Sequence, residues 1–154
     1  MTLNLLEGAI NALSTYLQAN YAAKVAALNA RYGDTLVEVP KAYYLGNMPL
    51  STPESPSVVI HGADWTPKSQ GHGILHISNA ISIVVFVGDD NVENRWRKLE
   101  RHALGIIEML NSGEASMGYN VKLVGPMANT EPMNTQPFLQ GKIMPILLEQ
   151  METY

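Results

Sequence analysis

The segment from Ile74 to Val87 carries the strongest strand pattern in this sequence, and it constrains the fold most. Successive side chains of a strand point to opposite faces of the sheet. One face would hold Leu75, Ile77, Ile81, Ile83, Val85 and Val87. The other face is polar in its first half, around His76 and Ser78, and apolar in its second half. We therefore predict one long β-strand that runs from an exposed part of a sheet into a covered part.

A helix is predicted near the start of the chain, because apolar residues recur there at three- and four-residue steps. These residues are Leu3, Leu6, Ile10, Leu13, Leu17, Tyr21, Val25 and Leu28. We expect Thr2 or Asn4 to cap its N-terminus, with Glu7 completing a capping box. Asn20 would mark a bend or a boundary between two helices, and Gly33 would end the segment in a left-handed conformation.

The same spacing predicts a second helix after the long strand. Its apolar stripe comprises Val92, Trp96, Leu99, Ala103, Ile106 and Leu110, widened by Ile107. Asp90 and Glu93 form a capping-box pattern at its start. The Asn-Ser-Gly run at residues 111–113 would stop this helix.

The remaining apolar runs predict shorter strands. Ser57–His61 has the pattern of a buried strand, and Val121–Val124 and Lys142–Tyr154 would be two closing strands. Pro145 has no N–H group. We therefore expect the last strand to lie at a sheet edge, or to pair on only one side at that position.

Loops are expected where proline and glycine gather. Residues 35–57 contain four prolines and would form an ordered loop anchored by the apolar island Ala42–Gly46. Residues 64–73 would form a turn or hairpin region. Residues 126–137 would form another proline-containing loop.

The order helix, loop, strand, long strand, helix, strand, strand predicts an α+β fold. We expect a two-layer sandwich in which a mainly antiparallel sheet carries the helices on one face. The 154 residues show no internal repeat and no domain boundary. Residues 1–154 are therefore expected to form a single domain.

Composition excludes several functional classes. The formal net charge of −4 excludes a strongly basic nucleic-acid binder. The chain has no cysteine, so a disulfide framework, a zinc–cysteine site and a thiol nucleophile are excluded. The longest apolar stretch, Ile81–Val87, is too short to span a bilayer, and the first residues lack the basic region of a signal peptide.

No catalytic or metal-binding constellation is predicted. His72 and His76 would lie roughly 13 Å apart on one strand face, too far for one ion, and nothing brings His61 to them. His102 falls on the polar side of the second helix, where we expect a solvated side chain. The two aspartates before that helix are explained by capping, and no Gly-x-Ser-x-Gly elbow occurs. We expect no enzymatic activity and no cofactor.

The one basic cluster of the sequence comprises Arg95, Arg97, Lys98 and Arg101. Glu93 can pair with Arg97 at a four-residue spacing. A solvated helix face with local ion pairs would explain this cluster. A contact surface for an acidic neighbouring subunit is the alternative, and direct nucleic-acid binding ranks third because the chain is acidic overall.

Two further groups are candidates for contact surfaces. Tyr43 and Tyr44 lie in the apolar island of the first loop. Methionine suits irregular cores and adaptable interfaces alike. Four of the eight methionines gather in the C-terminal portion, namely Met127, Met133, Met144 and Met151. We expect the tyrosine pair, the arginine face and the terminal strand to form assembly surfaces.

In the order and the hydrophobic pattern of these elements, the sequence resembles the tail-terminator and tail-completion proteins of tailed bacteriophages. After a leading helix, the resemblance follows "PSVVI", the strand "ILHISNAISIVVFVGDDN", the helix "VENRWRKLERHALGIIEML" and the closing strand "GKIMPILLEQMETY". It covers the chain from about Leu3 to Tyr154 and rests on element order and length rather than on an invariant motif.

This resemblance implies an α+β subunit that forms a ring, commonly a hexamer. Such a ring caps the tail tube, stops its polymerisation and offers the surface that joins the head. Its partners would be further copies of itself, the tail tube protein and a head–tail connector protein. DNA would only pass through the ring, and no membrane would be involved. The protein would lie in the tail or neck of the virion after assembly in the host cytoplasm.

Two alternatives stay open. Another neck subunit of the same particle, such as a head-closure or adaptor protein, would have a similar order of elements and a similar hydrophobic pattern. A small enzyme or ligand-binding module would instead place a cleft beneath the loop at Pro49–Pro56, lined by convergent polar groups.

Overall fold

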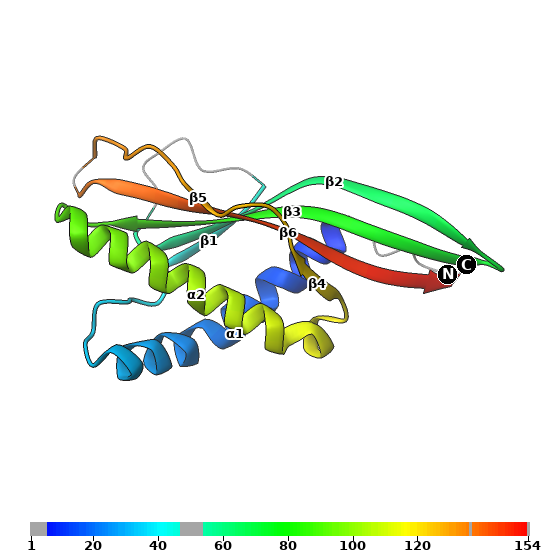
Figure 1. Cartoon of the computed structure of the whole chain (residues 1–154), viewed down its shortest axis with the longest axis horizontal. Coiled ribbons are helices and arrows are strands. Elements are labelled where there is room, and N and C mark those ends of the chain that lie inside the picture. The colour runs from blue at the N-terminus through cyan, green and yellow to red at the C-terminus, as the bar shows by residue number, and fades with distance from the viewer. Residues whose placement is uncertain (1–5, 47–53, 136, 154) are drawn as a thin grey trace.

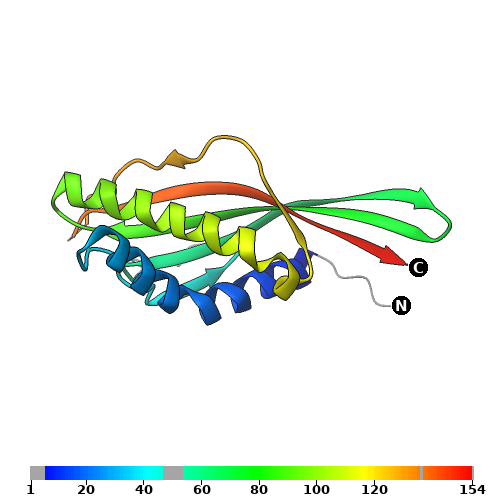
Figure 2. The same cartoon turned by 60° about the horizontal axis from the view of Figure 1, so that its bottom comes forward.

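Two helices cover one face of a six-stranded sheet in the computed structural model, which describes residues 6–46, 54–135 and 137–153 (Figures 1 and 2). The helices are α1 (Leu6–Tyr32) and α2 (Val92–Met117). The strands are β1 (Ala42–Leu45), β2 (Ser57–Gly71), β3 (Ile74–Gly88), β4 (Asn120–Leu123), β5 (Ala128–Asn129) and β6 (Leu139–Thr153). Their order is β1-β2-β3-β6-β4, with β5 beside β6, and every pair is antiparallel except β1 with β2. The predicted α+β fold, a mainly antiparallel sheet with helices on one face, is confirmed.

The core lies between the helices and the central strand β3. Ile81, Ile83 and Val85 point from β3 into this core, as the alternation predicted. The helices contribute Ala9, Leu13, Leu17, Tyr21 and Val25 from α1, and Leu99, Ala103, Ile106, Met109 and Leu110 from α2. Each large aliphatic side chain buried here contributes roughly 1.5–3 kcal/mol. Val92 and Trp96 depart from the predicted stripe, because both are exposed at the margin of the buried face.

α1 is one continuous helix. Asn20, the expected bend or boundary, lies within it, and its side-chain amide donates to the carbonyl of Tyr16 one turn earlier. Gly33 follows the helix with a φ of 69°, which confirms the predicted left-handed end. The expected caps Thr2 and Asn4 lie outside the described residues.

Both ends of α2 differ from the prediction. Asn91 rather than Asp90 is the N-cap, and its side chain accepts a hydrogen bond from the N–H of Asn94. The helix continues through the Asn-Ser-Gly run that was expected to stop it, because Gly113 is buried against α1. It ends at Gly118, which has a φ of 80°. Neither of the two described helices is long and apolar enough to cross a membrane.

The apolar island of the first loop forms a strand rather than a loop. β1 pairs in parallel with the first residues of β2. Two backbone hydrogen bonds flank this ladder, from Lys41 to Pro56 at 2.8 Å and from Gly46 to Ile60 at 2.9 Å. Nearby prolines are compatible with a short strand at the sheet edge. Residues 47–53 of the expected loop lie outside the described part of the chain.

β6 is an interior strand, so the expected edge position is wrong, but the alternative is confirmed: among the described strands, Pro145 has a register partner only in β3. It pairs with β3 along its whole length, and with β4 and β5 on its other side. Pro145 lies where the neighbour changes from β4 to β5, and its carbonyl accepts a hydrogen bond from the N–H of Val124 at 3.2 Å. The N and O of one strand residue point the same way, so the missing N–H costs no bond to β3.

β2 and β3 form a hairpin that projects past the helices (Figures 1 and 2). Residues 64–73 were expected to form a turn region, but β2 continues to Gly71, with a bulge between Gly62 and Asp64. The turn is confined to residues 72–73, where His72 has a φ of 52°. We call residues 62–80 of this hairpin the arm.

Candidate functional site

The arm carries the inner face of the sheet beyond the core. The buried core cluster ends at Ile81 on β3 and Leu148 on β6, whereas the hairpin continues past both. Directly opposed residues of an antiparallel pair share a face. Trp65 is paired with Asn79, so it lies on the same face as Asn79 and Ile77. This face continues the one that the helices cover in the body of the protein.

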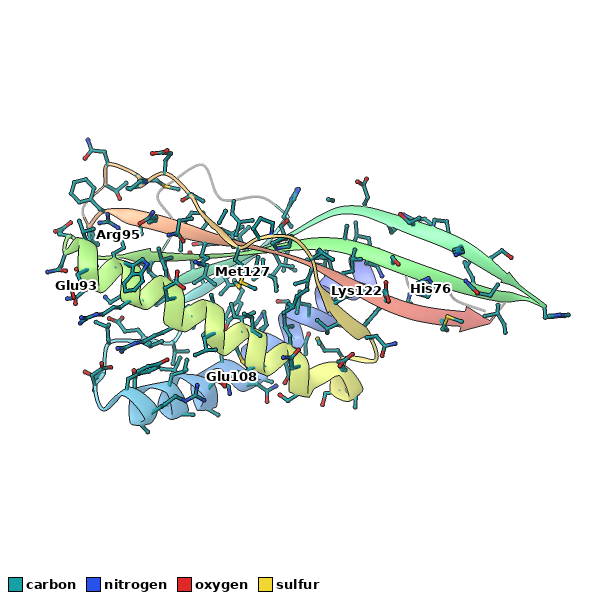
Figure 3. All side chains as sticks on the ribbon, in the orientation of Figure 1. His76, Glu93, Arg95, Glu108, Lys122 and Met127 are labelled. Carbon is teal, nitrogen blue, oxygen red and sulfur yellow. The ribbon has the colours of Figure 1, made fainter. Side chains whose placement is uncertain are left out.

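The two faces of the arm differ in chemistry. On the face that continues the core, Ile77 is fully buried, but Trp65 stays 40% exposed. The opposite face is polar and carries Asp64, Thr66, Lys68, His76 and Ser78 (His76 is labelled in Figure 3). An aromatic ring exposed on the apolar face of a projecting hairpin is typical of a surface that a partner covers.

The outer edge of the arm is protected against strand pairing. β1 covers β2 only at Ser57–Ile60, so no other described strand lies beside residues 61–71 on that side. The bulge at Gly62 distorts this edge, Pro67 offers no N–H, and Lys68 places a charge on it. Natural proteins use these devices against edge-to-edge association. These features protect the edge of the arm, but not its face, against association with another chain.

Arg95 does not belong to a contact surface. The residue is only 6% exposed, and it lies where α2 meets the start of β6 (Figure 3). Its Nε donates to Oε1 of Gln140 at 3.2 Å, and an Nη donates to the carbonyl of Asp89 at 2.9 Å. The guanidinium also lies over the ring of Phe138. These contacts hold α2 against the sheet. Arg95 is therefore a buried structural residue, and the expectation that it forms part of an assembly surface is wrong.

The other two arginines each pair with a carboxylate, one within α2 and one on another segment. Arg97 pairs with Glu93 four residues earlier, as predicted. Arg101 pairs with Asp34 at 2.7 Å and lies over the ring of Tyr32 at 4.1 Å. The hydrogen bond from Arg101 holds the pKa of Asp34 below its ordinary value. Arg97 thus makes the local pair that a solvated helix face would show, whereas Arg101 is largely buried and connects α2 to the segment after α1.

The two tyrosines of the apolar island are half-buried. The ring of Tyr43 meets that of Tyr21 edge-on, with centroids 6.4 Å apart. Burial raises the pKa of Tyr43 to about 12. The hydroxyl of Tyr44 accepts a hydrogen bond from the N–H of Glu54 at 3.4 Å. Tyr43 therefore contributes mainly to packing within the chain itself.

The four methionines occupy different environments. Met144 is buried in the core, so it cannot form part of an assembly surface. Met127 packs partly buried against the core (Figure 3), and Met133 forms an isolated bridge with Leu139. Met151 is 59% exposed and lies beside the arm, paired with His76. Of the four, Met151 is the most accessible to a partner.

Three histidines are dispersed and do not converge on an ion. Nδ1 of His61 donates to the carbonyl of Gly46 at 2.7 Å. Nε2 of His76 lies 3.8 Å from a carboxylate oxygen of Glu149. His72 lies in the turn at the tip of the arm. Across residues 6–46, 54–135 and 137–153, no group of three or more potential metal ligands occurs.

His102 is buried, so the expectation of a solvated side chain is wrong. It is 1% exposed, and its Nδ1 lies 2.6 Å from the hydroxyl of Tyr21. Burial lowers the pKa of His102 to about 4, and the nearby Lys98 ammonium acts in the same direction. Burial also raises the pKa of the Tyr21 hydroxyl. Both side chains are therefore uncharged near neutral pH.

A cavity of about 360 Å³ lies beside His102. It is open to solvent and is lined by the segment after α1, the residues just before β2, the end of β3, the start of β6 and α2. Its polar lining residues are Glu38, Lys41, Ser55, Lys98 and His102. Ser55 and Pro56 belong to the loop under which a ligand-binding module was expected to place a cleft.

Comparison with models of known protein families and with curated proteins finds no match to this chain. Two features stand out as candidate sites, namely the apolar face of the arm at Trp65 and the cavity beside His102. The sequence indicated neither Trp65 nor His102, although the ligand-binding alternative did place a cleft beneath the loop that contains Ser55 and Pro56. A tryptophan within a run of turn-forming residues is the signal that could have indicated Trp65. The four- and three-residue steps from Arg95 through Leu99 to His102 could have indicated the buried histidine.

Proposed function

We propose that this chain is a structural subunit that assembles head to tail into a closed ring through its arm. The proposal depends on one observation: Trp65 is exposed on a face that continues the core beyond the helices. Covering the exposed indole group of Trp65 with a neighbouring subunit would remove further apolar surface from water. The arm of one subunit would contact the body of the next, which is the part formed by the helices and the sheet that they cover. These are two different surfaces, so the contact would be heterologous. Such contacts generate closed rings when the rotation between subunits permits closure.

The resemblance to tail-terminator and tail-completion proteins suggests the role of this ring. In a tailed bacteriophage it would cap the tail tube, stop its polymerisation and provide the head-joining surface. The tail tube protein and a head–tail connector protein would be its partners in the virion. A net charge of −4 suits a channel that DNA passes through without binding.

Size-exclusion chromatography with light scattering tests the ring. The wild-type protein should form a defined oligomer at high concentration. Trp65→Ser should dissociate this oligomer, because the exposed indole group would no longer pack against the neighbouring subunit. Thr66→Ala changes the next residue, on the opposite face of the arm, and should leave the oligomer intact. A wild-type protein that stays monomeric at every concentration would contradict self-assembly through the arm.

Electron microscopy of particles made without this protein tests the terminator role. Loss of a terminator should yield overlong tails without heads, because nothing stops the growth of the tail tube. Tails of normal length that fail to join heads would instead indicate a head-closure or adaptor protein of the same neck. The two experiments separate the assembly of the ring from its place in the particle.

A further inference from the structure

Both tryptophans of the chain are exposed, and they lie towards opposite ends of the molecule. Trp65 belongs to the arm and is 40% exposed, whereas Trp96 belongs to the first turns of α2 and is 54% exposed. In Figure 3, the start of α2 is marked by Glu93 and the arm by His76, at the two ends of the long axis. Tryptophan is enriched among the residues that dominate the binding energy of protein interfaces. The two positions therefore indicate two separate contact surfaces on one chain.

Trp96 and Val92 form an apolar pair on the surface of α2. Residues four apart in a helix lie on one face, with their Cβ atoms about 5–6 Å apart. Val92 is 69% exposed, and these two are the most exposed large apolar side chains of the two helices. At this end of α2, Arg95 and Leu99 occupy the buried face. The fold of the single chain therefore leaves this pair on the surface.

The arm presents an apolar pair of similar spacing. Trp65 is paired with Asn79 and Pro67 with Ile77, so the exposed Trp65 and Pro67 share the face that continues the core. Alternate residues of a strand are roughly 6.5 Å apart, close to the spacing of the pair on α2. Neither pair contains a charge, so their contact would remove no charged group of these residues from water. The two pairs can therefore meet at two points.

Contact between these unlike pairs agrees with a head-to-tail arrangement. If Trp65 met Trp65, or Trp96 met Trp96, the contact would be isologous and assembly through it would stop at a dimer. If the arm meets the start of α2, each dimer still has one free arm and one free α2 surface. Further subunits can then add until the ring closes.

We propose that Val92 and Trp96 form the surface of the body that receives the arm of a second copy of this chain. Trp65 and Pro67 of the second copy pack on this pair. Residues that dominate the binding energy tend to meet one another across an interface, as the two tryptophans do here. This inference rests on the proposed ring and adds the identity of its second contact surface.

Mixing two variants, each blocked on one side, tests the proposal. Trp65→Ser has a defective arm and an intact α2 surface, and Trp96→Ser has the reverse. Each substitution should weaken the contact at least about 30-fold, so each variant alone should be monomeric by size-exclusion chromatography with light scattering. Their equimolar mixture should form a heterodimer and nothing larger, because it has one intact arm and one intact α2 surface. Tryptophan emission should move to shorter wavelength on mixing, since each variant keeps one tryptophan and the contact buries both.

Two control variants should assemble like the wild type. Trp96→Phe keeps an aromatic ring at the contact. Leu123→Ser removes a 43% exposed side chain from β4, which follows the other end of α2. Urea unfolding establishes that every variant is folded before its assembly is compared.

The outcomes separate this inference from the ring itself. If Trp96→Ser assembles like the wild type while Trp65→Ser is monomeric, the ring stands and the proposed α2 surface is wrong. A mixture of the two variants that contains only monomers also overturns the proposed contact. A wild-type protein that is monomeric at every concentration contradicts the ring, and this inference with it.

Discussion

Gly113 of α2 lies directly against the phenol ring of Tyr16 of α1. The hydroxyl of Tyr16 donates to the carbonyl of Met109, one turn before Gly113, at 2.8 Å. Because Gly113 has no side chain, the ring can lie across α2, and the hydrogen bond holds it there. This contact sets how closely the two helices approach. It also explains why α2 continues through a residue type that often ends helices.

Gly113→Ala should destabilise the protein by roughly 1–3 kcal/mol, because the added methyl group would overlap the Tyr16 ring. In an exposed helix the same change would instead be favourable by about 1 kcal/mol. Urea unfolding measures the difference. Ser116→Ala, at an exposed position of the same helix, should stay within about 0.5 kcal/mol of wild type. A Gly113→Ala protein at least as stable as wild type would contradict the contact.

Arg95→Ala should cost roughly 2–4 kcal/mol of folding free energy. The change would leave the side chain of Gln140 and the carbonyl of Asp89 without a donor and would remove packing against Phe138. Arg97→Ala is the matched control, because that arginine makes an exposed pair with Glu93 and should cost only about 0.5 kcal/mol. Equal losses in the two variants, measured by urea unfolding, would show that Arg95 is not structural.

Stability should fall as the pH is lowered from about 6.5 to about 4, because of His102. Its folded pKa of about 4 lies below the ordinary value of 6.5, so the unfolded chain binds the proton more tightly. The stabilisation is therefore complete above the unfolded pKa and is lost as the pH falls through the folded one. The loss over this window is about 3 kcal/mol.

Denaturant unfolding across this pH window checks the prediction. His102→Gln removes the titrating ring, so the variant should show a correspondingly shallower pH dependence. The comparison is needed because carboxylates also titrate at the lower end of the window. Parallel pH profiles for the wild type and the variant would mean that His102 is not buried in its neutral form.

Arg31→Gln should raise the pKa of Glu108 towards its ordinary value. The hydrogen bond from Arg31 is the main cause that lowers this pKa to about 2, and Lys24 adds a further attraction at 3.5 Å. A carbon-13 NMR titration of the Glu108 carboxyl group measures the change. Arg97→Gln, on a different part of the surface, should leave the titration unaltered. An unchanged pKa in Arg31→Gln would show that the pair does not persist in solution.

Strand β3 was predictable because a period of two is a local property of the chain. The buried face of α1 was predictable for the same reason, because the three- and four-residue spacing of its apolar side chains is also a local property. β2 shows the limit of local reasoning. Residues 64–71 include Pro67 and Gly71 and favour a turn, yet they form a strand because β3 provides a pairing partner along their whole length. The existence of the arm thus depends on a long-range pairing.

α2 shows what lies beyond the sequence. The predicted apolar stripe is buried from Leu99 onwards, but its first members Val92 and Trp96 are exposed. The structure buries two polar residues, Arg95 and His102, that the stripe did not include. Their partners include Gln140 of β6 and Tyr21 of α1, which lie far away along the chain. The sequence by itself determined the order and type of the main elements and most of their inner faces. Only the tertiary structure decided which polar side chains are buried, and hence where the cavity lies, because burial requires partners that folding brings together.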